Sequence, residues 1–254
     1  MTIEEKIEFL KNRYESIQLG LSQDEICIRP GIRFKITEFS RFGFEFFCWR
    51  SPEEMVLEMD CFVKYAYGKK RLIDVGSFHG IFSLVFNSMN KESESYAFEP
   101  SPDPFAVLMD NSVLNTSLKI NPIRLALSDT SIEVNMGKEW DHYVESDNGI
   151  SIKPSSGDGY FSNEMPTPIM IDALKIDVEG MELKVLNGFR QTIEVYHPTI
   201  FLELHLTKLP EAEVWEVIRF IEKHDYIILD SRTDAVANVY NILKEKTDLR
   251  LILL

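Results

Sequence analysis

The strongest chemical signal in this sequence lies where an apolar run meets an acid and two glycines. The stretch RLIDVGSFHGIFS ends one apolar segment at Asp74, places glycines at Gly76 and Gly80, and resumes as a new apolar segment at Ile81. Glycine permits a tight turn and a close approach of the backbone to a ligand. The N–H groups that open a helix point at whatever lies beyond it. The pattern predicts a strand, a ligand-binding turn and a helix.

A second acid, Glu99, follows the next apolar run, SYAFEP. It lies close to the offset of roughly 20 residues at which an acid binds a ribose in nucleotide-binding α/β proteins. The glycine spacing is GxxxG and differs from the GxGxxG of dinucleotide sites, which argues against a nicotinamide-dependent dehydrogenase. Asp74 would place negative charge near an ammonium or sulfonium group, which S-adenosylmethionine carries. The residues therefore favour a nucleoside that bears an amino acid.

Three side chains at the ends of later apolar runs are the candidates for catalysis. Asp177 lies near the end of the run ALKIDV, and His205 ends TIFLELH. Glu203 points to the same side as His205 because alternate strand residues share a face. With a usual pKa of about 6.5, His205 is suited to accept a proton at neutral pH. Asp177 and Glu179 have no further evident metal ligand nearby in sequence, so we predict no metal.

A sheet of parallel strands must position these residues. From residue 71 onward strand and helix patterns alternate, which is typical of an α/β fold with helices on both faces of the sheet. We expect strands over 71–75, 95–99, 120–127, 173–178, 199–205 and 226–230, with further strand pattern over 238–244 and 250–254. We expect helices over 81–89, 102–115, 180–189 and 211–224. Ligands bind at the carboxyl ends of such strands, where the candidate residues lie.

Two regions depart from this alternation. Residues 1–50 predict an N-terminal extension, with an amphipathic helix over 3–17 and short strands within 26–39 and 42–49, ahead of a main domain over 51–254. The main domain opens with Ser51-Pro52-Glu53-Glu54, which predicts a helix start with a capping box. The polar segment 136–170 shows no periodicity, and we predict a loop without secondary structure that covers the substrate.

Composition limits the partners. The formal net charge of −14 argues against a broad basic surface for nucleic acid. Three cysteines match neither a metal pair nor a disulfide framework, and the sequence has neither a signal-peptide pattern nor a long unbroken apolar run. We therefore expect a cytoplasmic protein that acts on a small molecule or glycan, with no membrane partner. The oligomeric state is not predicted.

The motifs together resemble a known family. DVGSFHGIFS, AFEPSPDPFAVL, ALSD, LKIDVEGMELKVLNG and HPTIFLELH occur in this order and are similar to the FkbM family of S-adenosylmethionine-dependent methyltransferases. The resemblance spans roughly residues 71–205, and KIDVEGMELKVLNG is its most specific part. It implies a class I methyltransferase fold, with a seven-stranded, mostly parallel sheet whose last hairpin is antiparallel. It also implies methyl transfer to a hydroxyl oxygen of a small molecule or sugar.

The resemblance further implies which residues hold the cofactor. They are Asp74, Gly76, Ser77, Phe78, Gly80, Glu99, Pro100, Leu127, Ser128 and Asp177. Asp74 and the glycines would line the methionine end, Glu99 the ribose, and Leu127 with Ser128 the adenine. Asp177 would lie close to the transferring methyl group.

Two departures from the family pattern keep a second function open. Between its glycines the family usually has a small residue, an Asn and an apolar residue, whereas this chain has Ser77, Phe78 and His79. A Thr-Leu-Asp segment and a helix commonly precede KIDVEG in the family, whereas here MPTPIMID runs into it directly. A binding or assembly protein that retains the methyltransferase fold without turnover is therefore the alternative to an O-methyltransferase.

Overall fold

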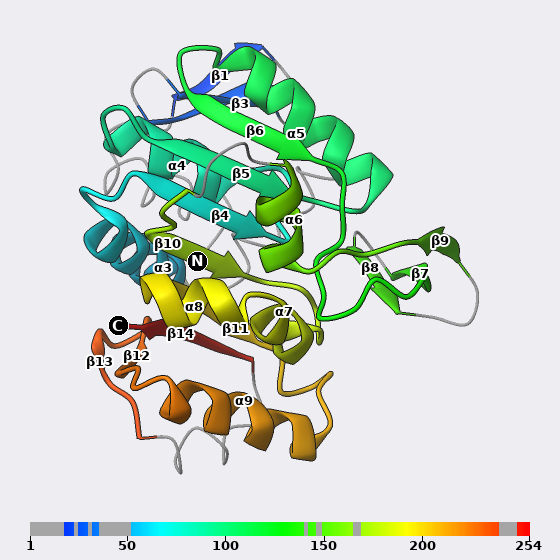
Figure 1. The fold of residues 1–254 in the computed structure, drawn as a ribbon. Coiled ribbons are helices and arrows are strands. Elements are labelled where there is room, and N and C mark those ends of the chain that lie inside the picture. The colour runs from blue at the N-terminus through cyan, green and yellow to red at the C-terminus, as the bar shows by residue number, and fades with distance from the viewer. Residues whose placement is uncertain are drawn as a thin grey trace.

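The computed structural model describes residues 18–22, 25–29, 32–35, 52–139, 142–145, 149–164, 169–238 and 248–254. Its centre is an eight-stranded sheet with helices on both faces (Figure 1). From one edge to the other the strands are β13 (Ala235–Val236), β12 (Ile228–Asp230), β14 (Leu249–Leu253), β11 (Thr199–Leu204), β10 (Ala173–Ile176), β4 (Arg71–Val75), β5 (Glu94–Phe98) and β6 (Lys119–Ile123).

The order of the strands creates the place where a ligand can bind. The chain runs outward from β4 through β5 to β6, and then returns to β10 on the other side of β4, with all these pairs parallel. Strand order therefore reverses between β4 and β10, which is the position at which ligands bind in open α/β sheets. Strand β14 is antiparallel to both β11 and β12, as the predicted last hairpin requires.

The sheet has one strand more than the seven predicted. The extra strand, β13, is two residues long and pairs antiparallel with β12 at the edge of the sheet. Both of its residues are exposed, so its side chains contribute no apolar pattern that the sequence could reveal.

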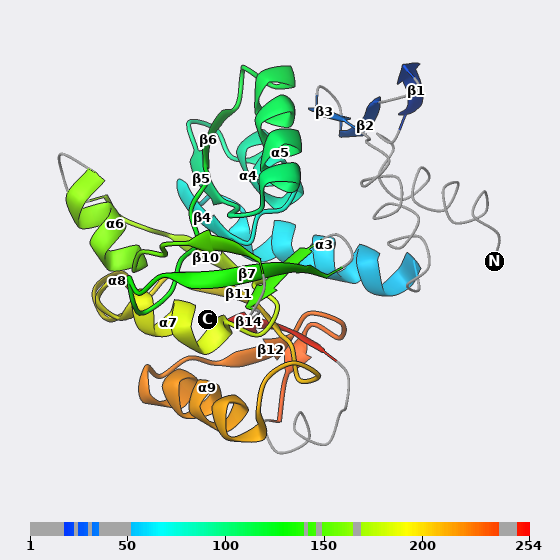
Figure 2. The same ribbon diagram turned by 90° about the vertical axis from the view of Figure 1, so that its right-hand side faces the viewer.

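Helices cover the two faces separately (Figure 2). One face carries α3 (Pro52–Ala66), α4 (Ile81–Met89) and α5 (Pro102–Leu114), and their buried side chains include Phe62, Phe86 and Leu108. The other face carries α6 (Gly157–Glu164), α7 (Glu182–Gly188), α8 (Arg190–Tyr196) and α9 (Glu211–Lys223). Strands buried on both faces are apolar at nearly every position, which explains why the sequence marks them clearly.

Most predicted elements are confirmed within a few residues. The strand 71–75 and the helix 81–89 have the predicted bounds, and helices lie over 102–114, 182–188 and 211–223. The sequence missed α8, because the turn at Phe189 resembles the end of α7 and the new helix is only seven residues long.

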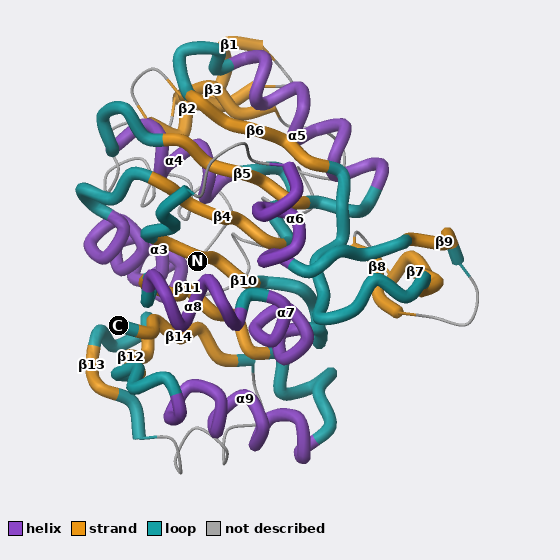
Figure 3. Tube along the Cα trace, viewed as in Figure 1, coloured by secondary structure: helices purple, strands orange, loops and turns teal. Residues whose placement is uncertain are grey.

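The prediction that residues 136–170 lack secondary structure is wrong. This insertion contains β7 (Val134–Glu139), β8 (His142–Glu145) and β9 (Ile150–Ile152), which form a small antiparallel sheet in the order β8-β7-β9, followed by α6 (Figure 3). Helix α6 has weak local signals, and tertiary contacts hold it. Phe161 is buried among Tyr96, Phe98 and Phe189, and Asp158 accepts hydrogen bonds from two backbone N–H groups of α8.

Part of the N-terminal extension packs on the main sheet's helices. β1 (Gln18–Ser22), β2 (Glu25–Arg29) and β3 (Ile32–Lys35) form an antiparallel sheet. Ile32 and Phe34 of β3 are buried with Leu84 of α4 and Leu108 of α5. The boundary between the N-terminal extension and the main domain, placed between residues 50 and 51, stays a prediction. The predicted helix over 3–17, the predicted strand over 42–49, the cap at residue 51 and the pattern over 239–244 lie outside the described residues.

A membrane-spanning segment would need a long apolar helix. Over the part of the chain that the structure describes, no helix meets this requirement.

Candidate active site

The glycine turn, residues 76–80, joins β4 to α4 with an unusual backbone. Gly76, Phe78 and Gly80 have φ angles of 72°, 50° and 84°, in the left-handed region that glycine adopts most readily. A Cβ atom on Gly76 would lie 1.8 Å from the carbonyl oxygen of Asp177, and one on Gly80 would lie 2.5 Å from Leu108 Cδ1. The close approach of the Asp177 backbone therefore requires glycine at position 76. At position 80 the neighbour is the end of a movable side chain, and the positive φ angle is what favours glycine.

Glu99 connects this turn to β5. Its carboxylate is nearly fully buried, and its two oxygens accept hydrogen bonds from the backbone N–H groups of Phe78 at 3.0 Å and Ser101 at 2.8 Å. Burial raises the pKa of Glu99, and the hydrogen bonds from Ser101 and Phe78 offset part of that rise. Each carboxylate oxygen has two lone pairs, so the side chain retains acceptor capacity for a diol.

Ser77 provides a test of whether the turn suits a polar cofactor. Its side chain is buried, and its Oγ makes no hydrogen bond to any other described residue. An unpaired buried hydroxyl is unfavourable, so the site is suited to a ligand with a polar group at this point. Phe78 stacks on His79 with ring centroids 3.7 Å apart, and Pro100 is half-buried beside Glu99. These residues fit S-adenosylmethionine.

Leu127 and Ser128, the predicted adenine residues, are both buried beyond the end of β6. Leu127 packs in the main core, and the backbone N–H of Ser128 donates to the carbonyl oxygen of Ser155 at 2.9 Å. The insertion therefore lies directly against this predicted wall of the cofactor site.

Asp74 is fully buried at the end of β4, next to a lysine that sequence reasoning missed. Ser83 Oγ donates a hydrogen bond to Asp74 Oδ2 at 2.7 Å. Lys175 Nζ lies 3.5 Å from Asp74 Oδ1 and 3.3 Å from Asp177 Oδ2. Lys175 Nζ also donates to the carbonyl oxygen of Gly76 at 2.8 Å. Burial raises the pKa of Asp74. Burial alone would lower the pKa of Lys175, but the carboxylates of Asp177 and Asp74 outweigh it and raise that pKa.

Sequence reasoning gave Lys175 no role because its contacts come from other strands. The available signal was a lysine at an inward-facing position of the apolar strand ALKI. A buried cation is rare unless it is paired.

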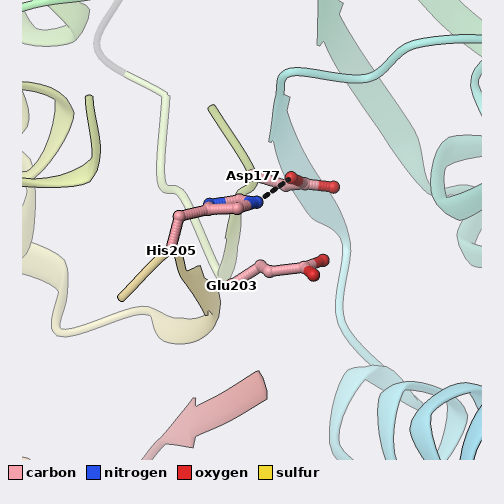
Figure 4. A group of neighbouring side chains, drawn as sticks. All are labelled: Asp177, Glu203 and His205. Carbon is pink, nitrogen blue, oxygen red and sulfur yellow. Dashed lines mark ion pairs between the residues drawn. The ribbon is translucent and has the colours of Figure 1, made fainter. Parts of the chain in front are cut away.

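The three predicted catalytic side chains lie together at the carboxyl ends of β10 and β11. One ligand atom from each of Asp177, Glu203 and His205 lies within 4.8 Å of the other two, and Figure 4 shows the three converging. His205 Nε2 is 3.8 Å from Asp177 Oδ1 and 3.4 Å from Glu179 Oε2. Carboxylates and an imidazole in this arrangement are able to hold a metal ion or to bind a hydroxyl group.

A second missed residue, Glu182, orients His205. Its fully buried carboxylate lies with Oε1 2.5 Å from His205 Nδ1. Burial alone would lower the pKa of His205, but Glu182, followed by Asp177 and Glu179, raises it to about 9. The ring thus carries a proton at neutral pH in this structure, whereas the sequence suggested a neutral one. The signal for Glu182 was an acid in the first turn of a helix that follows the strand with Asp177.

A cavity opens beside Asp177 and Glu203, between the sheet and helices α3 and α4. Its walls combine the aromatic rings of Phe62, Phe82 and Phe201 with the charged groups of Lys175 and Arg250. Arg250 Nη2 lies 2.8 Å from Glu203 Oε1, so an ion pair forms part of the wall. The cavity and the glycine turn approach the same residue, Asp177.

The sheet order, its antiparallel last hairpin and the turn at the reversal point define a class I methyltransferase fold. The family model described as "Methyltransferase FkbM domain" matches residues 74–228, more than half of the chain. The chain belongs to the FkbM family of methyltransferases, which confirms the resemblance, and its cofactor is S-adenosylmethionine.

Two known proteins illustrate this relationship. The hexuronic acid methyltransferase AglP of Haloferax volcanii is 31% identical over 172 residues, which cover 62% of this chain and 69% of AglP. The solved structure of a methyltransferase FkbM from Methylobacillus flagellatus KT has a TM-score of 0.53 and 16% identity. That match covers 74% of this chain and 44% of the other, so this chain spans less than half of that protein.

Proposed function

We propose that this protein transfers a methyl group from S-adenosylmethionine to a hydroxyl oxygen of a sugar or another small metabolite. One observation carries the proposal. The glycine turn with Glu99 and the cluster of Asp177, Glu203 and His205 meet at the carboxyl ends of β4, β5, β10 and β11. A cofactor side and an acceptor side are therefore adjacent at the point where strand order reverses.

The cofactor side uses the residues that the family resemblance implied. Glu99 would accept the ribose hydroxyls, and Asp74 and Asp177 would place negative charge near the methionine end. Ser77, Phe78 and Pro100 would shape the pocket around them, with Leu127 and Ser128 near the adenine. When bound, the cofactor supplies an electrophilic methyl group, so the chain's main task is to align the acceptor with it.

The acceptor side is the cavity next to Asp177 and Glu203. With a volume of about 30 Å³, the cavity has room for the reacting hydroxyl group, and the rest of a sugar would lie outside it. The hydroxyl would lie among Asp177, Glu203 and His205. The carboxylate of Asp177 or Glu203 would accept its proton as the bond from the hydroxyl oxygen to the methyl carbon forms and the methyl–sulfur bond breaks. The similarity to AglP supports a sugar acceptor and makes a hexuronic acid the first one to test.

The composition of the chain bears on the class of acceptor and on the location of the protein. A net charge of −14 supports a small or glycan acceptor over nucleic acid, and the cysteine pattern supports a cytoplasmic location.

Calorimetric titration of the wild type with S-adenosylmethionine and S-adenosylhomocysteine tests the cofactor side, with Glu99→Ala as the deficient variant. We expect binding by the wild type and at least a tenfold loss in the variant, because Glu99 fixes the turn and contacts the ligand. Equal affinity in both would contradict this assignment of the site.

Mass spectrometry of reactions with uronic acids, neutral sugars and their nucleotide derivatives then tests turnover. A product heavier by one methylene group supports methyl transfer. Tight cofactor binding without product across the panel would favour the binding or assembly protein instead.

A further inference from the structure

We infer that Asp177, Glu203 and His205 form a binding site for a divalent metal ion, and that this ion binds the hydroxyl of the acceptor. The first half of this inference stands on the geometry of the three side chains alone. The second half rests on the proposed function.

The three ligand atoms have the required spacing. Metal bonds of about 2.0–2.2 Å to oxygen and nitrogen place neighbouring ligand atoms about 3–4.4 Å apart. The three atoms here lie within 4.8 Å of one another, so small side-chain rotations bring them to one centre. They come from the ends of two adjacent parallel strands, β10 and β11, which hold them at fixed separation (Figure 4).

The orientation of His205 is an independent observation that points to a ligand. Its ring is only 4% exposed, and Nδ1 is bound to the buried Glu182. Nε2 faces the cluster, where its nearest carboxylate oxygens are Glu179 Oε2 at 3.4 Å and Asp177 Oδ1 at 3.8 Å. A carboxylate on one ring nitrogen and a metal on the other is the usual arrangement of a metal-binding histidine.

The surrounding charge also favours a cation. The carboxylates around the cluster include Asp74, Asp177, Glu179, Glu182 and Glu203. The cationic side chains that pair with them are Lys175, Lys208 and Arg250. The carboxylates named here outnumber the cations, so the excess negative charge favours a divalent ion.

The ion would serve the proposed reaction directly. Bound between Asp177 and the adjacent cavity, it would hold the acceptor hydroxyl by its oxygen and polarise it, so that its proton is removed more easily. His205 would then be a metal ligand. Two carboxylates and one imidazole suit Mn²⁺ or a similar ion that accepts both oxygen and nitrogen ligands.

The test is Mn²⁺ binding to the chelator-treated protein, followed by electron paramagnetic resonance and without cofactor or acceptor. We expect one ion per chain in the wild type. Glu203→Gln and His205→Asn should each weaken binding at least tenfold, and Glu182→Gln should weaken it about tenfold because the ring loses its orienting partner. Glu211→Gln, an exposed change on α9, is the control and should leave Mn²⁺ affinity unchanged.

The affinity of each variant for S-adenosylmethionine shows whether it is folded, because Glu203, Glu182 and His205 lie outside the proposed cofactor residues. A wild type that binds the cofactor but no Mn²⁺ overturns the inference. Mn²⁺ binding that Glu203→Gln and His205→Asn do not change overturns it as well. Failure of the wild type to bind the cofactor would count against the proposed function, while the Mn²⁺ result would still decide the metal site.

Discussion

The two ends of the same central strands carry charges in opposite arrangements. At the amino ends, Glu94 is held by Arg71 at 2.6 Å and by Lys119 at 2.7 Å, and Asp172 accepts hydrogen bonds from two backbone N–H groups. At the carboxyl ends, carboxylates outnumber their cationic partners. Asp74 Oδ1, Ser77 Oγ and Glu182 Oε2 are buried there without a hydrogen bond to a described residue.

The backbone does not share this contrast. Left-handed φ angles occur beyond the carboxyl ends of β4 and β10 and also ahead of the amino ends of several strands. The first group is Gly76, Phe78, Gly80, Glu179 and Gly180, and the second is Gly68, Glu92, His197 and Asp225. Buried unpaired polar groups cost stability and persist at functional sites, where a ligand makes use of them. We conclude that the ion pairs at the amino ends stabilise the fold, whereas the charged side chains at the carboxyl ends are arranged to bind a ligand.

The largest effect should come from Gly76→Ala, which places a Cβ atom 1.8 Å from the carbonyl oxygen of Asp177. We expect a loss of more than about 4 kcal/mol in the free energy of unfolding, together with loss of cofactor binding. Gly68→Ala is the matched control, because Gly68 has a similar φ of 79° but nothing within 4 Å of the added Cβ. It should cost about 1–2 kcal/mol. Equal losses of unfolding free energy in the two variants, measured by urea denaturation, would show that backbone conformation, and not the close approach of Asp177, accounts for the effect of Gly76→Ala.

Next in size is Lys175→Met, which removes a buried cation from between Asp74 and Asp177. Breaking a buried ion pair on one side costs about 3–5 kcal/mol. Lys119→Met, at the amino end, removes a lysine whose side chain is 70% exposed and should cost less than about 1 kcal/mol. Urea denaturation of both variants measures the difference, and similar losses would remove the contrast between the two ends.

Glu99→Gln should have a smaller effect, and it tests the cofactor site directly. The amide keeps one acceptor oxygen but loses the charge, and a hydrogen bond to a charged group contributes about 1.5–3 kcal/mol. The dissociation constant for S-adenosylmethionine should therefore rise about 10–100-fold. Glu94→Gln makes the same change at the other end of β5 and should leave that constant unchanged in calorimetry. A rise in both variants would mean that β5 as a whole, and not Glu99, controls affinity.

The smallest effect concerns the stability that Glu94 contributes. Burial raises the pKa of Glu94, but the hydrogen bonds from Lys119 and Arg71 outweigh it, so the pKa is lowered. A lowered pKa stabilises the fold above the unfolded value of about 4.3, and this contribution disappears as pH falls through the folded value. Glu94→Gln should therefore cost about 1 kcal/mol at pH 7 and much less near pH 3. Denaturation at the two pH values measures this, and a loss that does not depend on pH would exclude an ionic origin.

The acids of the site could be predicted from the sequence because each one ends an apolar run. Asp74 lies near the end of a buried strand, Glu99 and Asp177 follow buried strands, and parallel strands bring their carboxyl ends to one edge. The supporting residues could not be predicted in this way. Lys175 contacts the ends of two strands, and Glu182 reaches His205 across a separation of 23 residues, so neither contact appears in a local pattern.

The structure of the insertion, residues 136–170, could not be predicted for the same reason. Its strands are short, and α6 depends on the burial of Phe161 and on the contact between Asp158 and α8. Periodicity reports only contacts that repeat along one element, and these contacts do not.

The sequence by itself determined the main alternation of strands and helices outside the insertion, the glycine turn and the acids that follow it, because polarity and spacing are local properties of the chain. Tertiary structure alone decided that Asp177, Glu203 and His205 converge and that the pKa of His205 rises to about 9. Both results depend on carboxylates from several elements meeting in a buried place, where charges interact far more strongly than in water.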